Sequence, residues 1–224
     1  SYSCRDNKGT HRALKRFAQF AYALSQRNTQ SVWVLKCDIR KCFASVDQHI
    51  LLALLRQHIR CPRLFAVLES VITSFSAGSL GKGIPLGNLT SQLFINIYLH
   101  ELDSYIKRTL GITYYIRYAD DFVIMANDRS LLDRYAYLIS VFLENKLKMK
   151  LHPGKICIKT LATGLDFLGW VHFPDHVILR TSTRERMFRT IQRSLHREAT
   201  IQSYLGMLSH GNAYRLSQKV QRLL

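Results

Sequence analysis

Two adjacent acidic residues lie between two runs that favour β-structure, and this stretch, residues 114–125, constrains the fold most. Residues 114–118 and 122–125 are rich in aromatic and β-branched side chains, which fit a pleated, half-buried surface. Residues 119–120 between them predict the turn of a tight β-hairpin. The carboxylates of Asp120 and Asp121 would then lie at the tip of an apolar hairpin.

Adjacent carboxylates at such a tip need compensation, because they repel each other and lose hydration. A divalent cation is one solution, since carboxylate oxygens are ligands that suit Mg²⁺ and Mn²⁺. A solvated turn is the simpler alternative, because Asp is common in turns of every kind. A third carboxylate nearby would favour the metal.

A third carboxylate follows the apolar run at residues 32–37. This β-branched run predicts a buried strand, and Asp38 lies at its far end. A strand that ends beside the hairpin tip would bring Asp38 close to Asp120 and Asp121. We therefore expect the three acids to converge on a divalent metal.

The net charge of the chain points to its partner. Lys and Arg outnumber Asp and Glu by 32 to 15 over 224 residues, a formal net charge of +17, and the basic residues recur along the whole length. Such a field favours nucleic acid, which gains from the release of counterions. No apolar segment is long enough to suggest a membrane span. Five scattered cysteines without a Cys-x-x-Cys pair argue against a disulfide framework or a structural zinc site.

Apolar residues at helical spacing predict helices around the strands. Ser45 and Gln48 have the spacing of a capping box at one helix start. The glycine-rich run at residues 81–88 predicts an irregular loop that a ligand can approach closely. We expect helices over residues 13–24, 46–55, 64–75, 89–109 and 131–147 and from residue 184 onward, and strands over residues 156–159, 165–171 and 177–179.

Basic residues line one side of the helix expected from residue 184 onward, at steps of three and four residues. A helix that is basic along one side suits the backbone of a nucleic-acid duplex, and a merely soluble face is the alternative. The residues concerned are Arg186, Arg189, Arg193 and Arg197.

Four short motifs, in order along the chain, resemble the palm of reverse transcriptases. Any one of them is weak evidence, but four in the expected order are specific, and they span nearly the whole chain. The motifs are residues 35–43, residues 83–92, Tyr118-Ala119-Asp120-Asp121 and Phe167-Leu168-Gly169-Trp170.

The resemblance implies an α+β fold: a polymerase right-hand palm with an antiparallel sheet and packed helices, partial fingers and a short helical thumb. Residues 1–30 and 48–110 would form a fingers remnant and the palm helices, with earlier finger strands preceding Ser1. Residues 31–47 and 111–180 would form the palm sheet with its catalytic and primer-grip hairpins, and residues 181–224 the thumb.

The resemblance also implies roles at the catalytic centre. Asp38 and Asp120 would hold two Mg²⁺ ions, with Mn²⁺ as the alternative, and Asp121 would contribute more weakly. Lys155 matches a lysine proposed to protonate the leaving pyrophosphate, although a solvated surface charge is an equal alternative. Phe43 resembles an aromatic residue that excludes a ribose 2′-hydroxyl.

Other positions would face the nucleotide or the primer. The backbone at Ile39 lies in the turn after Asp38, where it could face a nucleotide. The resemblance implies that Leu86, Gly87 and Gln92 lie beside the incoming nucleotide. It also implies that Phe167, Leu168, Gly169 and Trp170 grip the primer terminus.

Within the reverse transcriptases, Leu86-Gly87 followed by Ser91-Gln92 is most similar to the enzymes of diversity-generating retroelements, which copy a template RNA with errors at adenines. An aliphatic Leu86 in place of a polar glutamine removes a hydrogen-bonding side chain beside the nucleotide. The expected partners are an RNA template, a DNA/RNA primer duplex, deoxynucleoside triphosphates and a basic accessory protein, in the cytoplasm as a bacterial or phage-encoded enzyme. Group II intron or retron enzymes are the alternative, as are a two-metal nuclease and a nucleic-acid-binding scaffold without activity.

Overall fold

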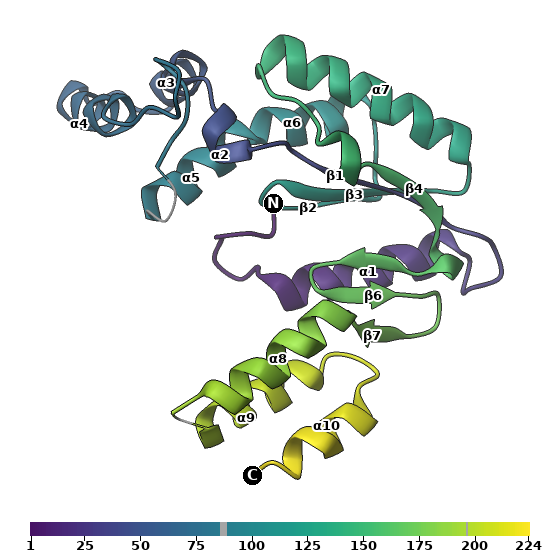
Figure 1. Ribbon diagram of the computed structural model, residues 1–224. Coiled ribbons are helices and arrows are strands. Elements are labelled where there is room, and N and C mark those ends of the chain that lie inside the picture. The colour runs from purple at the N-terminus through teal and green to yellow at the C-terminus, as the bar shows by residue number, and fades with distance from the viewer. Residues whose placement is uncertain (86–88, 196) are drawn as a thin grey trace. The chain divides into compact units, whose positions relative to one another are not determined.

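The computed structural model describes residues 1–85, 89–195 and 197–224 (Figure 1). The chain forms two compact units, which we describe separately. The first unit contains residues 1–20 and 33–158, and the second contains residues 21–32 and 159–224. The hairpin expected to grip the primer therefore belongs with the C-terminal helices.

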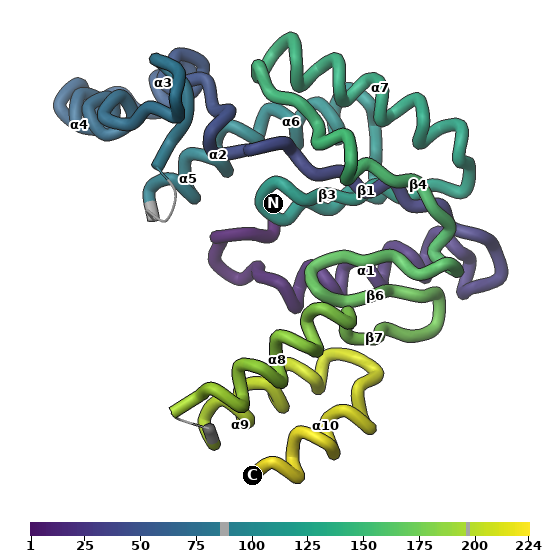
Figure 2. The backbone as a smooth tube through the Cα atoms, in the orientation of Figure 1, coloured from purple at the N-terminus to yellow at the C-terminus, as the bar shows by residue number. Residues whose placement is uncertain are grey.

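The first unit is built on an antiparallel sheet with the strand order β2-β3-β1-β4. The central pair, β1 and β3, run side by side (Figure 2), and their register sets Asp38 opposite Asp121. The predicted hairpin and the predicted strand before Asp38 are thus confirmed. The strands are β1 (Trp33–Asp38), β2 (Tyr115–Tyr118), β3 (Asp121–Ala126) and β4 (Cys157–Thr160).

Helices cover this sheet and extend beyond it. The long helix α7 packs directly on β1 and β3, and α6 packs beside it, as Figure 1 shows. The helix expected over residues 89–109 is interrupted at Leu99 and ends in a π-helical turn, η1. The helical segments are α1 (Thr10–Leu24), α2 (Cys42–Ser45), α3 (Gln48–Arg56), α4 (Pro62–Thr73), α5 (Leu89–Tyr98), α6 (His100–Ser104), η1 (Tyr105–Thr109), α7 (Arg129–Lys146) and η2 (Pro153–Lys155).

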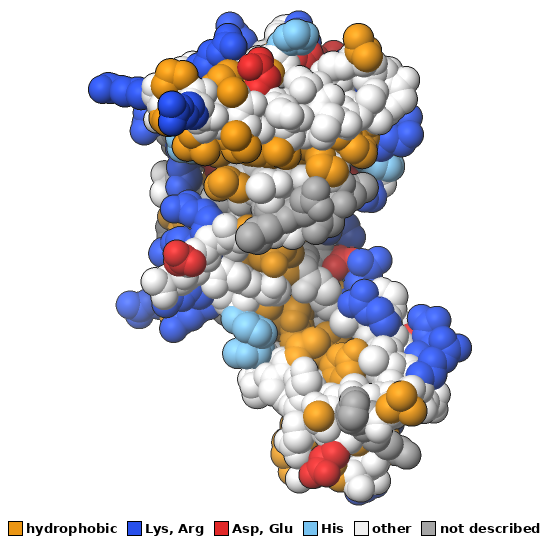
Figure 3. Space-filling model, turned by 90° about the vertical axis from the view of Figure 1, so that its left-hand side faces the viewer, with side chains coloured by type: hydrophobic (Ala, Val, Ile, Leu, Met, Phe, Trp, Pro, Cys, Tyr) orange, Lys and Arg blue, Asp and Glu red, His pale blue; other side chains and the backbone are white. Residues whose placement is uncertain are grey.

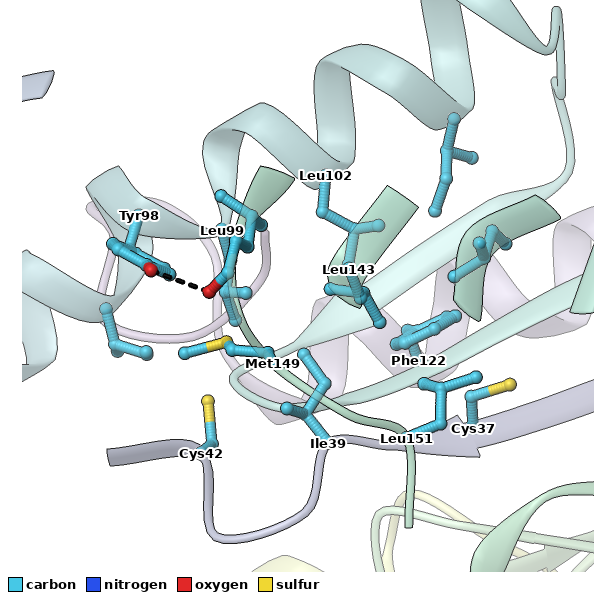
Figure 4. Packing of buried hydrophobic residues seen from close by; sticks show 14 of the residues in the cluster. Cys37, Ile39, Cys42, Tyr98, Leu99, Leu102, Phe122, Leu143, Met149 and Leu151 are labelled. Atoms are coloured by element: carbon cyan, nitrogen blue, oxygen red, sulfur yellow. Dashed lines mark hydrogen bonds between the residues drawn. The ribbon is translucent and has the colours of Figure 1, made fainter. Parts of the chain in front are cut away.

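The core of this unit lies between the sheet and these helices (Figure 4). Phe122 from β3 and Leu143 from α7 are fully buried, and burial of such a side chain contributes roughly 1.5–3 kcal/mol. The Tyr98 side chain is buried in this core, and its hydroxyl donates to the Leu147 carbonyl at 2.7 Å. This bond fixes the start of the segment that follows α7.

The capping box predicted at Ser45 and Gln48 is wrong. Asp47 caps α3 instead, accepting from the Ile50 N–H at 3.1 Å, because Ser45 is still in α2. Gln48 is buried, and its amide nitrogen, which has two hydrogens to donate, lies 2.7–3.0 Å from the carbonyl oxygens of Ile72, Phe75 and Gly83. One side chain therefore ties the end of α4 to the glycine-rich loop.

The second unit combines a small sheet with a helical cluster. The predicted strand over residues 165–171 is divided into two strands, because Leu168 and Gly169 have positive φ angles of 53° and 84° and form a two-residue turn. The hairpin expected over residues 167–170 is therefore present. The elements of the second unit are η3 (Leu161–Thr163), β5 (Leu165–Phe167), β6 (Trp170–His172), β7 (Val177–Leu179), α8 (Thr181–Arg193), α9 (Arg197–Leu208) and α10 (Tyr214–Gln221).

The helices of the second unit pack around their own apolar core, which contains Met187, Ile191, Ile201 and Val220. Gly211 precedes α10 and lies against the indole of Trp170 so closely that a Cβ atom would clash with it. Across the described residues of both units, no helix is both long and apolar enough to traverse a bilayer.

Candidate active site

The three predicted acids come together at one end of the first unit's sheet. Asp38 is the last residue of β1, Asp121 the first of β3, and Asp120 lies in the turn between β2 and β3. The Ile39 N–H donates to the Asp120 carbonyl at 3.2 Å, which ties the end of β1 to the hairpin tip. This proximity follows from the antiparallel register alone.

Two lysines partly neutralise these acids. The Lys155 Nζ lies 3.0 Å from Asp38 Oδ2, and the Lys36 Nζ lies 3.5 Å from Asp121 Oδ2. The hydrogen bond to Asp38 raises the pKa of Lys155, which further favours the protonated form of its side chain. Lys36, to which the sequence analysis gave no role, is two residues before Asp38 and therefore on the same face of the strand.

The compensation remains incomplete at the hairpin tip. Burial is the main cause that raises the pKa of Asp121 to about 6, with smaller contributions from the charges of Asp38 and Asp120, against the lowering effect of Lys36. Burial also raises the pKa of Asp120, assisted by the charge of Asp38. Asp121 Oδ1 is buried and has no hydrogen-bond partner among the described residues. The positive charge near these two carboxylates is therefore too small to compensate them fully.

The turn that carries Asp120 is held from behind by a buried arginine. Arg117 donates to both carboxylate oxygens of Asp103, at 2.8 and 2.6 Å, and to the carbonyl of Ala119 at 2.9 Å. The Tyr115 hydroxyl donates to the same carboxylate at 2.7 Å. Ala119 has a φ of 53°, a left-handed conformation that residues with a Cβ rarely adopt. The Arg117 contact therefore supports an unfavourable turn.

This network is charged in spite of its burial. Burial opposes ionisation of Asp103, but the hydrogen bonds and charge of Arg117 outweigh it and hold the pKa of that carboxyl below its usual range. Neither Arg117 nor Asp103 was predicted from the sequence as part of the site. The available signal was a charged residue at position 117 in a strand otherwise expected to be buried.

The acids fit a metal held by two carboxylates. Among the described residues, no three Asp, Glu, His or Cys side chains are gathered closely enough to hold one ion. Mg²⁺ is usually bound by one or two carboxylates together with waters and substrate phosphates. The raised pKa values and the buried Asp121 Oδ1 show that added positive charge would be favourable here. Asp38 and Asp120 are a suitable pair to hold it, because they come from two different elements and the charge of Asp38 helps to raise the pKa of Asp120.

The residues predicted to face a nucleotide have different surroundings. Phe43 is half-buried against the core, and Gln92 is exposed and accepts from the Cys4 thiol at 2.8 Å. The Ile39 side chain is in the core and its N–H is used by Asp120, so Ile39 offers a nucleotide little in this conformation. Leu86 and Gly87 lie outside the described residues.

The primer-grip motif and the arginine stripe belong to the second unit. Phe167 and Trp170 are buried and build the hairpin, which leaves the turn at Leu168 and Gly169 as its accessible part. On α8, Arg186, Arg189 and Arg193 line one hollow together with Thr190 and Ser194, and the side chain of Arg197 lies outside the described part. Figure 3 shows one face of the molecule, on which Lys and Arg are far more prominent than Asp and Glu.

Comparison with known proteins connects this geometry to a family. A family model described as Reverse transcriptase (RNA-dependent DNA polymerase) matches residues 1–172. Protein YkfC of Escherichia coli (strain K12) is 24% identical over an alignment of 230 positions, and the match covers 85% of this chain and 58% of that protein. Group II intron-encoded protein LtrA of Lactococcus lactis subsp. cremoris is 21% identical over an alignment of 263 positions, and the match covers 88% of this chain and 42% of that protein. The chain thus spans about half the length of these relatives.

Solved telomerase structures share the fold. Telomerase from Candida tropicalis in complex with a fragment of telomeric RNA matches with a TM-score of 0.62 at 13% identity, over 96% of this chain and 41% of that one. The apo enzyme matches with a TM-score of 0.64 at 14% identity, over 88% and 40%. At such low identity the likeness concerns the fold alone, and it confirms the expected arrangement of helices on an antiparallel palm sheet.

Proposed function

Because the chain belongs to the reverse transcriptase (RNA-dependent DNA polymerase) family, we propose that it carries the catalytic palm of an enzyme that synthesises DNA on an RNA template. The observation that carries the proposal is the set of three carboxylates at one sheet edge, two of them with raised pKa values. A scaffold without catalytic function would gain nothing from this electrostatic cost.

In the proposed reaction the primer 3′-oxygen forms a bond to the α-phosphorus of a deoxynucleoside triphosphate. The bond from that phosphorus to the bridging oxygen breaks, and pyrophosphate leaves with the electron pair. Two Mg²⁺ ions, when bound, would favour deprotonation of the 3′-hydroxyl and neutralise charge on the phosphates.

The chain's own residues would position these groups. Asp38 and Asp120 would hold the ions from two different elements, and Arg117 would keep the Asp120 turn in place through the Ala119 carbonyl. Lys155, protonated and beside Asp38, would supply a proton to the leaving pyrophosphate. Phe43 would lie against the sugar.

We further propose an error-prone enzyme of a diversity-generating retroelement, on the support of Leu86 and Gln92. Group II intron proteins are among the relatives of this chain, so the pattern of errors is the property that separates the two. Misincorporation concentrated at template adenines supports the first assignment, and evenly distributed errors support the second.

Primer extension tests the main proposal. The full-length parent protein is incubated with an RNA template, a DNA primer, Mg²⁺ and four deoxynucleotides, and the products are sequenced. We expect DNA synthesis that is lost in Asp120→Asn and kept in Asp133→Asn, a matched change in an exposed residue on α7. Tight RNA binding without synthesis by the parent would refute the enzymatic function.

A further inference from the structure

A pocket of about 280 Å³ in the first unit is surrounded by basic side chains. Three segments that are distant in sequence form it: the turn after β1, the loop before α5 and the segment after α7. The cations that line it are Arg40, Lys41, Lys82, Lys148 and Lys150.

Backbone hydrogen bonds hold these segments together, so the fold fixes the backbone positions that carry the charges. The Arg40 N–H donates to the Lys150 carbonyl at 2.9 Å, and the Gln48 N–H donates to the Gly81 carbonyl at 3.0 Å. The Ser45 hydroxyl donates to the Arg40 carbonyl at 3.1 Å. The wall of the pocket is therefore part of the folded core's framework.

The backbone also directs the lysines toward the pocket. Met149 is buried in the core between Lys148 and Lys150, which are both exposed. Lys41 and Lys148 adopt left-handed conformations, with φ angles of 46° and 51°. Strained residues of this kind tend to cluster at ligand-binding sites.

The positive charge of the pocket has no internal compensation. No acidic residue lines it. Within the described ranges, none of the five cations has a carboxylate within 4.0 Å. Like charges around one concavity repel each other, and a multiply charged anion would relieve that repulsion.

We propose that this pocket binds pyrophosphate and holds it as it leaves the active site. The inference rests on the proposed polymerase function, which produces pyrophosphate at Asp38, two residues before Arg40 in the same strand-to-turn segment. A compact volume with converging cations suits a small polyphosphate. A nucleic-acid backbone is better matched by charges in a row, as on α8.

Calorimetric titration with inorganic pyrophosphate, without Mg²⁺ or nucleic acid, tests the pocket directly. The variant Lys41→Asn/Lys150→Gln removes two charges while respecting the left-handed backbone at position 41, which Asn tolerates. Lys15→Gln/Lys146→Gln removes two exposed charges of the same unit outside the pocket and is the matched control. Thermal melts monitor folding of both variants.

We expect the pocket variant to bind pyrophosphate about tenfold or more weakly, and the control less than about twofold, since screening limits distant charges. Equal affinity in both variants would overturn the proposal. A loss of affinity for single-stranded RNA with unchanged pyrophosphate affinity would overturn it too, in favour of an RNA-backbone site.

Asp38→Asn separates the pocket from the reaction. We expect this variant to lose DNA synthesis and to keep pyrophosphate affinity. If the parent protein makes no DNA, the proposed function fails, while the pyrophosphate titration still tests the pocket.

Discussion

Removal of the Arg117 guanidinium should lower the free energy of unfolding of the first unit more than removal of any exposed charge. In Arg117→Met the methionine retains most of the apolar stem, so the loss is electrostatic. The change deletes two charge-assisted bonds to Asp103 and one bond to Ala119. Hydrogen bonds to charged groups contribute about 1.5–3 kcal/mol each, and breaking a buried pair costs about 3–5 kcal/mol. We expect a loss of about 3–5 kcal/mol, a large part of a typical domain's stability.

The double variant Arg117→Met/Asp103→Leu distinguishes the pair from simple loss of packing. It removes the carboxylate that the single change would leave with the Tyr115 hydroxyl at 2.7 Å and the Ser1 ammonium at 3.5 Å as its donors. We expect it to be less destabilised than Arg117→Met alone by about 2 kcal/mol or more. Its DNA synthesis should stay low, because the Ala119 carbonyl still lacks its donor.

Urea titration in a Trp170→Phe background gives the measurement, because Trp33 in β1 then reports the first unit alone. Arg134→Met, a change in an exposed residue of α7, is the control, and we expect a loss of less than about 0.5 kcal/mol. A cost below about 1 kcal/mol for Arg117→Met, or a double variant that costs the sum of the single changes, would refute the reasoning.

Three further predictions concern the second unit. Burial lowers the pKa of His172 to about 4, so the free energy of unfolding should fall by up to about 3 kcal/mol as the pH drops from about 6.5 to 4. Urea titrations at both pH values should show this loss. If the loss persists in His172→Phe, this histidine is not its cause. Gly211→Ala should destabilise the protein by about 1–3 kcal/mol, because the added Cβ atom clashes with Trp170. Gly206→Ala, in a helix with open space around it, should stabilise the protein by about 0.5–1 kcal/mol. Thermal melts that rank the two variants the other way would contradict the close packing of Gly211 on Trp170. Arg189→Gln should weaken binding of a nucleic-acid duplex and reduce the number of counterions released on binding by about one. Anisotropy titrations at several salt concentrations measure both effects. An equal effect of Arg134→Gln would mean that α8 has no special role in duplex binding.

The catalytic edge could be predicted because it depends on local rules. Runs of β-branched, aromatic and apolar residues predicted the strands, and the antiparallel hairpin then placed Asp120 near Asp38 without further information. The charge pattern of α8 was equally local. The fold class followed because strands and helices in this order form an α+β layer structure.

What the sequence did not reveal depends on contacts between distant residues. Arg117 and Asp103 are both charged, and only the packing of α6 against the hairpin makes their pair a buried one. Ser45 lost its predicted cap because α2 extends through it. Leu168 adopts a positive φ of 53° in the hairpin turn, a conformation that is uncommon for leucine and that its residue type does not predict.

The discontinuity of the second unit has a consequence for the order of folding. Residues 21–32 belong to that unit, and the Val32 carbonyl accepts from the Leu161 N–H at 2.8 Å. During synthesis these residues must wait for residues 33–158 to emerge, which takes roughly 6–25 s at about 5–20 residues per second. The first unit can thus pair β1, β2 and β3 before residues 21–32 acquire their contacts with residues 159–224. Ribosome-bound chains of increasing length should become protease-resistant at residues 21–32 only after residue 161 has emerged.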